Sequence, residues 1–337
     1  MKKFFGILIC FIIAVPAWYL GRSFPVAGGP IIAILAGIII SQFVPNLLKI
    51  KFAGDYDFSE GVKYTSKKLL QYSIILLGFD MNLFNIFRVG SMSLVVLAFV
   101  FLSALLTAFF IGRLLKLEGN TTVLIGVGTS VCGGSAIAAV APVIRAEDED
   151  VTRAISTIFL FNIAAVLIFP ILGRLLGMAD ADFGVWAGAA INDTSSVVAA
   201  GTAWSNLAGN NTALAFATIV KLTRTLMIAP IALILAIYTA RKMKNTQDIN
   251  FSFVKVFPWF VLFFIAAAIT NTFIGLPPNT SQLLVNIGKF GITMALAAIG
   301  LNTNLKNLFS SGIKPLLLGF ICWVVVALFA LAILRLV

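Results

Sequence analysis

A stretch of small and polar residues interrupts the apolar sequence between residues 126 and 142, where it reads GVGTSVCGGSAIAAVAP. Each glycine costs a helix up to about 1 kcal/mol relative to alanine, and nearby hydroxyls can bond the backbone groups that a broken helix leaves free. The pattern predicts a helix that is broken inside a membrane and resumes near Ser135. The N–H groups at such a helix start attract anions. The alternative is close packing of an unbroken helix through its small residues.

A second polar stretch lies between residues 188 and 201, which read GAAINDTSSVVAAG. Five consecutive polar residues run from Asn192 to Ser196 within an apolar segment. An ionised Asp near the centre of a bilayer costs roughly 2.5–3.5 kcal/mol on insertion scales, so a functional or paired role for Asp193 is the first interpretation. The second interpretation is that Asp193 caps a helix that begins there. The two are compatible, because both need a helix start at this point.

Two cations follow in the stretch TIVKLTRTLMIAP, residues 218–230. Lys221 lies about ten residues inside an apolar run, which places it roughly 15 Å deep at 1.5 Å per helical residue. Arg224 is three residues further on and shares the same helix face. Two cations on one face repel each other unless something negative lies beside them. Asp193 and a bound anion are both candidate partners, and a purely structural bridge from Asp193 to either cation is the third interpretation.

The composition places these residues in a membrane protein. The chain has 337 residues, 60% of them hydrophobic and only 11% charged, whereas soluble domains carry roughly 25% charged residues. About 20 apolar residues span a bilayer core, and runs of this length recur along the chain. We expect one all-helical polytopic membrane domain over residues 1–337, whose first apolar run is a retained helix rather than a cleaved signal peptide. The expected membrane spans are about eleven, at roughly 4–20, 24–43, 66–86, 91–115, 120–142, 152–177, 183–204, 210–239, 253–274, 281–303 and 313–335.

The distribution of Lys and Arg predicts the orientation of the chain. The net charge of +11 does not call for a nucleic-acid partner, because the basic residues alternate between loops as the positive-inside rule requires. We expect the bacterial inner (plasma) membrane, with the N-terminus in the cytoplasm and the C-terminus outside. The inner loops then hold Lys2, Lys3, Lys49, Lys51, Lys63, Lys67, Lys68, Arg113, Lys116, Arg174, Arg241, Lys242, Lys244, Lys306 and Lys314. The outer ends hold Arg22, Arg88, Arg145, Arg153, Lys289 and Arg335.

Metal and cofactor chemistry are not expected, and neither is enzymatic activity. The chain has no His and only three Cys, which lack the spacing of metal ligands. It shows no nucleotide-binding loop, which argues against ATP-driven transport by this chain alone. The acidic run from Glu147 to Asp150 could trap a cation, but a solvated helix start, where the helix dipole favours negative charge, is the simpler interpretation.

An internal repeat links two distant turns. GFDMNLFNIFRVG begins at Gly78 and GLNTNLKNLFSSG begins at Gly300, and six of the thirteen positions are identical. The predicted topology puts the two copies on opposite sides of the membrane, which is the signature of an inverted-topology repeat, and such repeats build many secondary transporters. The alternative is chance similarity between two Asn-rich turns.

Three segments resemble the YeiH-type bacterial membrane protein family, whose members are often labelled sulfate exporters. They read TSVCGGSAIAAVAPVI, NDTSSVVAAG and KLTRTLMIAPIAL, in this order and with LLGF upstream. The resemblance covers nearly the whole chain. It implies the fold group of the bile-acid symporters and cation/proton antiporters, with two inverted repeats, helices unwound at mid-membrane, and a core part, here including residues 120–240, separate from a scaffold. Asn192 stands where the family often has His, so a His-based proton relay is absent here.

The leading hypothesis is a secondary active transporter of a small anion, such as sulfate or an organosulfonate, bound between the two broken helices. The residues expected to bind the anion are Ser130, Gly133, Gly134, Ser135, Thr194, Ser195, Ser196, Lys221 and Arg224, and those expected to bind a coupling Na⁺ or H⁺ are Asn192 and Asp193. One alternative is a sodium/proton antiporter that uses Asn192 and Asp193 with Lys221 as counter-ion, and another is a channel or a non-transporting sensor. Besides the anion and the lipid bilayer, a second copy of the chain is a candidate partner.

Overall fold

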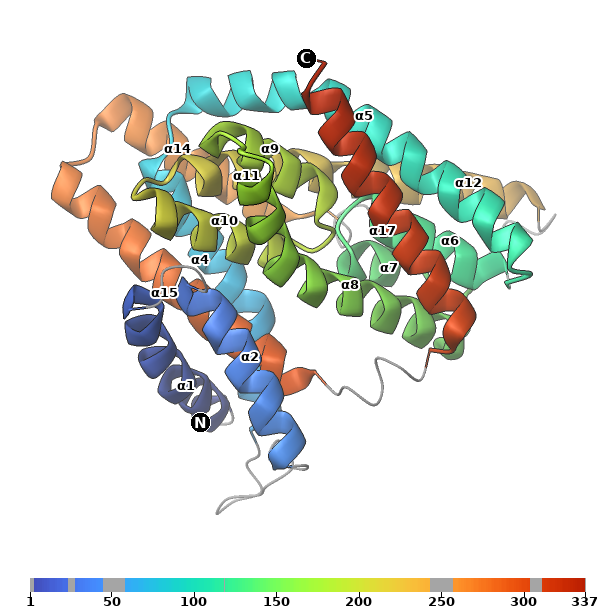
Figure 1. The fold of residues 1–337 in the computed structure, drawn as a ribbon, viewed down its shortest axis with the longest axis horizontal. Helices are drawn as coiled ribbons and strands as arrows, with labels where there is room; N and C mark the ends of the chain where they lie inside the picture. The colour runs from blue at the N-terminus through green and yellow to red at the C-terminus, as the bar shows by residue number, and fades with distance from the viewer. Residues whose placement is uncertain are drawn as a thin grey trace.

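The computed structural model describes residues 3–23, 28–44, 58–117, 119–242, 257–303 and 311–336, and all regular secondary structure in these ranges is helical. The elements in chain order are α1 (Phe4–Ser23), α2 (Gly28–Phe43), α3 (Ser59–Tyr64), the π-helix η2 (Thr65–Leu69), α4 (Leu70–Leu77), the 3-10 helix η3 (Gly78–Asp80), α5 (Leu83–Leu114), α6 (Gly119–Ser130), α7 (Gly134–Val140), α8 (Asp148–Leu175), α9 (Asp180–Ala190), α10 (Thr194–Ala208), α11 (Thr212–Leu226), α12 (Ile228–Lys242), α14 (Trp259–Ile274), α15 (Pro278–Asn302) and α17 (Ile313–Leu334). The two ends of the chain lie on opposite sides of the helical body (Figure 1).

Several helices have the length and composition of membrane spans. Six are long and apolar enough to cross a membrane, namely α1, α5, α8, the run through α11 and α12, α15 and α17, and the shorter α2 and α14 are also apolar. Large apolar side chains such as Phe110, Leu114 and Phe273 face outward. An outer surface of this kind suits lipid rather than water. The predicted all-helical, multi-pass membrane protein is confirmed at this level.

The crossing helices run between two faces of the molecule, which we call the amino face and the carboxyl face after the chain end that each carries. At the amino face, Lys3 before α1 lies 4.6 Å from the ring centroid of Tyr64, at the end of α3. At the carboxyl face, Asn211 before α11 donates its amide to Asp80, in the turn before α5, at 3.1 Å. Helices α5 and α15 run from the carboxyl face to the amino face, and α8 and α17 run the opposite way.

Helices α6 and α7 form a hairpin, which passes from the amino face into the interior of the helical body and then returns to the amino face. Thr121, in the first turn of α6, donates its hydroxyl to Asp150, in the first turn of α8, so the two helix starts lie side by side. A helix that continued in one direction would separate two residues 29 positions apart by roughly 40 Å. Helix α7 packs back on α6 instead, and Ile137 lies 3.0 Å from the position that a Cβ on Gly128 would take. The chain reverses at Gly133, whose φ of 67° and ψ of −130° are accessible to glycine but rarely to other residues.

Helices α9 and α10 form a second hairpin, which enters from the carboxyl face. Trp204, near the end of α10, donates its Nε1–H to Asp180 Oδ1 at the start of α9, with 2.7 Å between the atoms. The Trp204 ring also stacks on Phe183, with centroids 4.0 Å apart. The two arms are therefore pinned together at the face from which they enter. Since α8 runs between the faces, the two hairpins enter from opposite sides.

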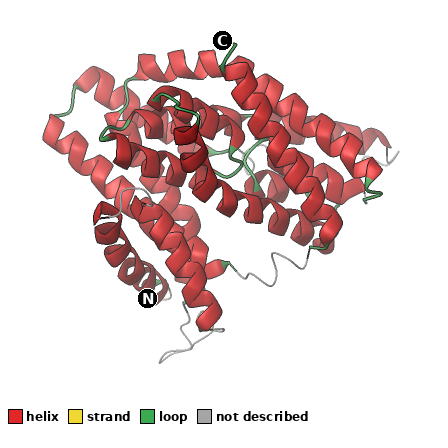
Figure 2. Ribbon diagram, viewed as in Figure 1, coloured by secondary structure: helices red, strands yellow, loops and turns green. Residues whose placement is uncertain are grey.

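Both predicted helix breaks are present, at residues 131–133 and 191–193. The direction of the chain after each break differs from the prediction, because neither stretch continues to the opposite face. Small and polar residues interrupt a helix whether the chain then continues or reverses, so the sequence pattern does not separate the two cases. As a result, loop segments lie in the middle of an otherwise helical body (Figure 2).

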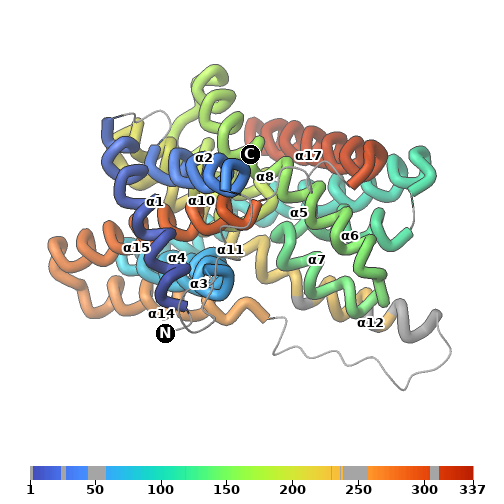
Figure 3. Tube along the Cα trace, turned by 90° about the horizontal axis from the view of Figure 1, so that it is seen from below, coloured from blue at the N-terminus to red at the C-terminus, as the bar shows by residue number. Residues whose placement is uncertain are grey.

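The helices pack as two groups that lie side by side (Figure 3). The hairpin group contains both hairpins together with α5, α8, α11, α12 and α17, and the panel group contains α1, α2, α3, α4, α14 and α15. The two groups touch chiefly where α10, the second arm of the second hairpin, packs against α2 and α15. The hairpin tips are thus enclosed mostly by their own group.

The described parts of the two repeat copies lie at opposite faces. Ser281, near the start of α15, donates its hydroxyl to the carbonyl of Phe79, next to Gly78 in the first copy. Gly300, the first residue of the second copy, lies at the other end of α15. A helix of 25 residues is roughly 37 Å long, so its length separates the two turns. Residues 304–310 of the second copy lie outside the described residues, as do Lys2, Lys49, Lys51 and Lys244 of the predicted inner loops.

Candidate functional site

The tips of the two hairpins meet in the interior beside α11. Both tips, residues 131–133 and 191–193, lie against the part of α11 that carries Lys221 and Arg224. These two side chains are 0% and 2% exposed, so each charge must be satisfied by the protein itself. The sequence therefore predicted correctly that the two interruptions and the two cations come together.

All three N–H donors of the Lys221 ammonium have a backbone acceptor. Its Nζ donates to the carbonyl of Val131 at 2.8 Å, to that of Ile191 at 3.2 Å and to that of Asn192. An ammonium group has three donors and no acceptor, so no N–H remains for another partner. Lys221 thus joins the last carbonyls of both hairpin arms that end at the tips.

The Arg224 guanidinium uses its five donors in the same way. Its Nε donates to Ser130 O at 2.8 Å, and one terminal nitrogen donates to Ala189 O at 2.6 Å and to Ile191 O at 3.3 Å. The other terminal nitrogen donates to the carbonyl of Thr129 and to the side-chain oxygen of Asn192, the latter at 3.4 Å. Five donors thus meet five acceptors, four of which are backbone carbonyls.

This arrangement stabilises the C-terminal ends of α6 and α9. The last carbonyls of a helix have no intrahelical partner and carry about half a negative charge between them. Two such ends face each other here, and two cations lie between them. Among the described residues no ion pair joins Asp193 to either cation. Backbone carbonyls, which the sequence analysis did not consider, are the partners of Lys221 and Arg224, and a direct role of either cation in anion binding stays a prediction.

Asp193 acts as the N-cap of α10. Its carboxylate accepts hydrogen bonds from the backbone N–H of Ser195, at 3.0 Å, and from the Ser195 hydroxyl. The capping interpretation of the sequence is therefore confirmed. Asp193 and Thr194 are half-buried, whereas Asn192, Ser195 and Ser196 are buried. The predicted coupling-ion residues thus lie at the tip of the second hairpin, with only Asp193 partly open.

The remaining predicted residues lie at the tip of the first hairpin. Ser130 is the last residue of α6 and donates its hydroxyl to Val127 O at 3.1 Å. Gly133 is the N-cap of α7, and Gly134 and Ser135 form the first turn. Gly134 is half-buried and Ser135 is exposed. Helices α7 and α10 begin directly after the two tips, with Gly133 and Asp193 as their N-caps.

Asn162, on α8, is a site residue that the sequence analysis did not identify. It is 3% exposed and lies beside both tips. Its Oδ1 accepts the backbone N–H of Asp193 at 3.2 Å, and its Nδ2 lies 3.5 Å from the position that a Cβ on Gly133 would take. None of the described residues accepts a hydrogen bond from its Nδ2 group. A single Asn in a long apolar helix was the available signal, because a buried polar side chain normally finds a partner.

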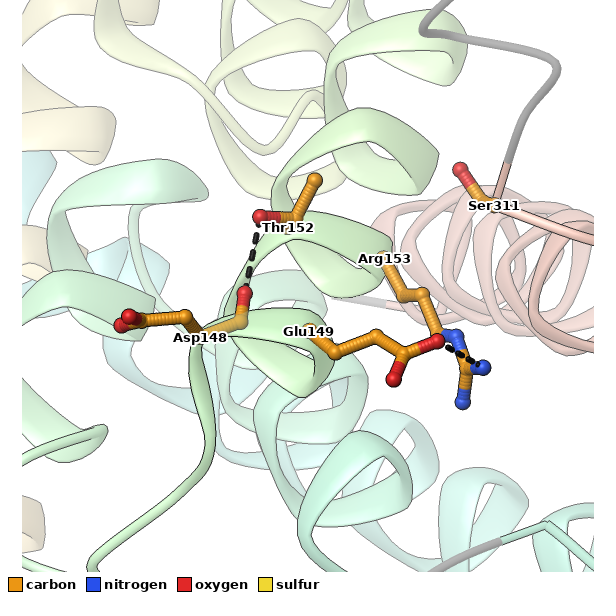
Figure 4. Close-up of a pocket in the computed structure, with 5 residues that line it drawn as sticks. All are labelled: Asp148, Glu149, Thr152, Arg153 and Ser311. Atoms are coloured by element: carbon orange, nitrogen blue, oxygen red, sulfur yellow. Dashed lines mark hydrogen bonds and ion pairs between the residues drawn. The ribbon is translucent and has the colours of Figure 1, made fainter.

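Two hollows lie away from the tips. One of about 360 Å³ is lined by Asp148, Glu149, Thr152, Arg153 and Ser311 at the start of α8 (Figure 4). There Glu149 pairs with Arg153, and the acidic run forms the first turn of α8 as predicted. The other, of about 260 Å³, lies at the carboxyl face beside Asp80 and Asn211. Lys289 donates to Asn211 Oδ1 at 2.7 Å, which links the panel group to the start of α11.

Comparison with known proteins shows which family the chain represents. The model of the family described as Conserved hypothetical protein 698 matches residues 5–319. A UPF0324 membrane protein of Streptococcus pyogenes serotype M3 is 48% identical over 336 residues, which cover 98% of this chain and 96% of the relative. The chain belongs to the UPF0324 family. The resemblance found in the sequence is thereby confirmed.

Other UPF0324 relatives are similar over an equally complete length. One from Fusobacterium nucleatum is 45% identical over 342 residues, covering 97% of this chain and 96% of the relative, and one from Streptococcus mutans is 45% identical over 337 residues, covering 98% and 96%. No solved structure matches the chain. The names of these UPF0324 relatives describe membrane proteins and specify no substrate.

Proposed function

We propose that this UPF0324 protein is a secondary transporter of a small anion, with sulfate and organosulfonates as the first candidates. The observation that carries the proposal is the charge at the hairpin tips. Lys221 and Arg224 are buried there with Asp193 as the only nearby carboxylate among the described residues. Two helix C-termini partly offset the cations and two helix N-termini partly offset the carboxylate, which leaves a positive surplus. A surplus of this sign inside a low-dielectric interior favours an anionic ligand.

The anion would bind on the side of the tips where α10 begins. The donors of Lys221 and Arg224 are occupied, so the cations would act through their field rather than by contact. The first N–H groups of a helix have no intrahelical partner and suit an oxyanion. The hydroxyl of Thr194 lies at this helix start and is half-buried, so it remains within reach of a ligand.

The packing supports two inverted repeats, of which the second is circularly permuted. Helix α5 packs on α6 as α17 packs on α9, α6 packs on α8 as α9 packs on α11, and α4 packs on α14 as α15 packs on α2. Equivalent positions of the tips also share a cation: Val131 and Ile191 accept from Lys221, and Thr129 and Ala189 accept from Arg224. On this scheme nine segments cross the membrane and two hairpins enter it. An experimental structure in which α6–α8 and α9–α11 did not superpose would contradict it.

The two repeats differ in the packing of one pair of equivalent helices, α10 and α7. We infer from this difference which face of the protein the site opens to. Helix α10 packs on α2 and α15 of the panel group, but its equivalent α7 packs on α6, α8 and α12. The residues Ser135 and Ala138, on the other side of α7, are exposed. The site would then be closed toward the carboxyl face and open toward the amino face. Alternating access would exchange the two arrangements.

The amino face would be cytoplasmic. The hairpins move Arg145 and Arg153 to the amino face and Arg174 to the carboxyl face, compared with the eleven-span prediction. The described cations at the amino face are then Lys3, Lys63, Lys67, Lys68, Arg113, Lys116, Arg145, Arg153 and Lys314, and those at the carboxyl face are Arg22, Arg88, Arg174, Lys289 and Arg335. The positive-inside rule assigns the more basic face to the cytoplasm.

The first test is a thermal-shift screen of the purified protein against sulfate, methanesulfonate, chloride, Na⁺ and Li⁺. A ligand that binds only the folded state adds about 2.7 kcal/mol of stability at 100 times its Kd. We expect sulfate or methanesulfonate to raise the melting temperature and chloride at equal ionic strength to leave it unchanged. Radiolabelled uptake of the same anion into proteoliposomes would then establish transport. Protection by Na⁺ or Li⁺ alone would overturn the anion proposal in favour of the antiporter, because Asp193 could hold a cation.

A second test measures which face reaches the site. The native cysteines Cys10, Cys132 and Cys322 are buried, so wild-type protein is the background control. We expect a Ser135→Cys variant to react with a membrane-impermeant maleimide in inside-out vesicles and not in right-side-out vesicles. Ala208→Cys, at the exposed end of α10, should show the opposite pattern. Labelling of both variants from the same side would contradict the proposed topology.

A further inference from the structure

We propose that Asn162 donates its side-chain amide to the transported oxyanion and is the contact that makes the site anion-selective. This inference rests on the proposed function and adds a binding residue to it. The juxtaposition that carries it is an unpartnered amide donor placed between the two hairpin tips, next to the start of α10.

The orientation of the amide is set by its other half. Asn162 Oδ1 accepts the N–H of Asp193, so the Nδ2 group points away from that N–H. Exchanging the two amide atoms would bring two donors together, which is unfavourable. The Nδ2 atom therefore faces the tip of the first hairpin. It lies 3.5 Å from where a Cβ on Gly133 would be, so Gly133 places no side chain against the donor.

An unpartnered buried donor is costly, and an incoming acceptor removes the cost. Asn162 is 3% exposed and its Nδ2 atom is buried, so an anion has to enter between the tips to reach it. The amide hydrogens carry partial positive charge and the start of α10 adds more of the same sign, so an oxyanion fits this place and a metal cation does not. The nearby Asp193 carboxylate is engaged by Ser195, and the two cations behind the tips outnumber it.

The alternative is that Asn162 has a structural role and only accepts the hydrogen bond from the backbone N–H of Asp193. The variant Asn162→Asp separates the two roles, because it keeps the size of the side chain and the acceptor for Asp193 but replaces the donor by a carboxylate. We expect its Kd for sulfate or methanesulfonate to rise at least tenfold, with a melting temperature of the ligand-free protein close to that of wild type. Because the new carboxylate would also repel an anion without touching it, the uncharged variant Asn162→Ser is measured beside it, and a purely structural Asn162 predicts an unchanged Kd for Asn162→Ser.

The control is Thr202→Val, on α10, which removes a buried hydroxyl that likewise has no hydrogen-bond partner among the described residues. Its Kd should stay within twofold of wild type. If Asn162→Asp does not fold, Asn162→Ser, which is shorter and uncharged, should still weaken anion binding tenfold or more. A folded Asn162 variant that binds the anion with wild-type affinity would overturn this inference and leave the proposed function untouched. The absence of any anion binding to wild type would overturn the proposed function itself.

Discussion

A Lys221→Met variant is expected to lose a large part of its stability, and the loss should exceed any change in ligand affinity. The substitution leaves the carbonyls of Val131, Ile191 and Asn192 buried without a donor and lets two helix C-termini face each other with only Arg224 between them. Removing one partner from a buried, hydrogen-bonded charge site costs about 3–5 kcal/mol. Folded proteins are stable by only about 5–15 kcal/mol. The yield of monodisperse protein and its melting temperature in detergent measure the effect.

Lys289→Met is the matched control for Lys221→Met. Lys289 is also a cation within an apolar helix, but its ammonium donates to the side chain of Asn211 near the carboxyl face and bridges no helix ends. Its replacement should lower the melting temperature much less. A Lys221→Met protein that folds with normal stability would show that the hydrogen bonds of Lys221 to the carbonyls of the two tips do not hold the helix ends together.

Gly133→Ala should destabilise the protein by about 1–3 kcal/mol, the cost of holding a residue with a side chain in a backbone region that favours glycine. The reason is conformational rather than steric. The added Cβ would lie 3.4 Å from Ile158 and 3.5 Å from Asn162 and Asp193, which are ordinary contact distances, but the φ of 67° remains. A lower melting temperature and weaker anion binding are both expected, because the tip would shift and the methyl group would lie against Nδ2 of Asn162.

Gly134→Ala, one residue further, is the control for the backbone effect. Gly134 lies inside α7 without a positive φ, and among the described residues its Cβ would meet only Phe159, at 3.6 Å. Alanine in a helix is more stable than glycine by roughly 0.5–1 kcal/mol, so Gly134→Ala should be neutral or stabilising. Equal destabilisation by both substitutions would mean that the tip tolerates no added volume, and that the reversal of the chain does not depend on glycine at position 133.

The positions of both helix breaks could be predicted from the sequence, but the direction of the chain after each break could not. Glycine clusters and the Asn192–Ser196 run weaken a helix wherever they occur, so both breaks were predicted at the right place. Whether the chain then reverses depends on two dihedral angles at Gly133 and on contacts such as that of Thr121 with Asp150, residues 29 positions apart. These contacts are tertiary, and neither helix propensity nor hydropathy contains them.

The partners of the cations were missed for a related reason. A search through side chains offers only acids, so Asp193 was the natural candidate for Lys221 and Arg224. Backbone carbonyls are present at every residue and become acceptors only where a helix ends inside the protein. Asn162 was missed because α8 is otherwise an ordinary apolar helix, and a lone Asn gives no spacing from which to infer a site. The structure identifies it through the position of its two amide atoms.

The hydrogen bonds that Lys221 donates to both tips have a consequence for biosynthesis. The carbonyl of Val131 accepts a hydrogen bond from Lys221, which lies 90 positions later in the chain. At synthesis rates of about 5–20 residues per second, that donor emerges roughly 5–20 s after the tip itself. Lipid offers no donor to an open carbonyl during this interval. The first hairpin is therefore made before the helix that supplies this donor, and the carbonyl of Val131 stays without its native partner until α11 has been synthesised.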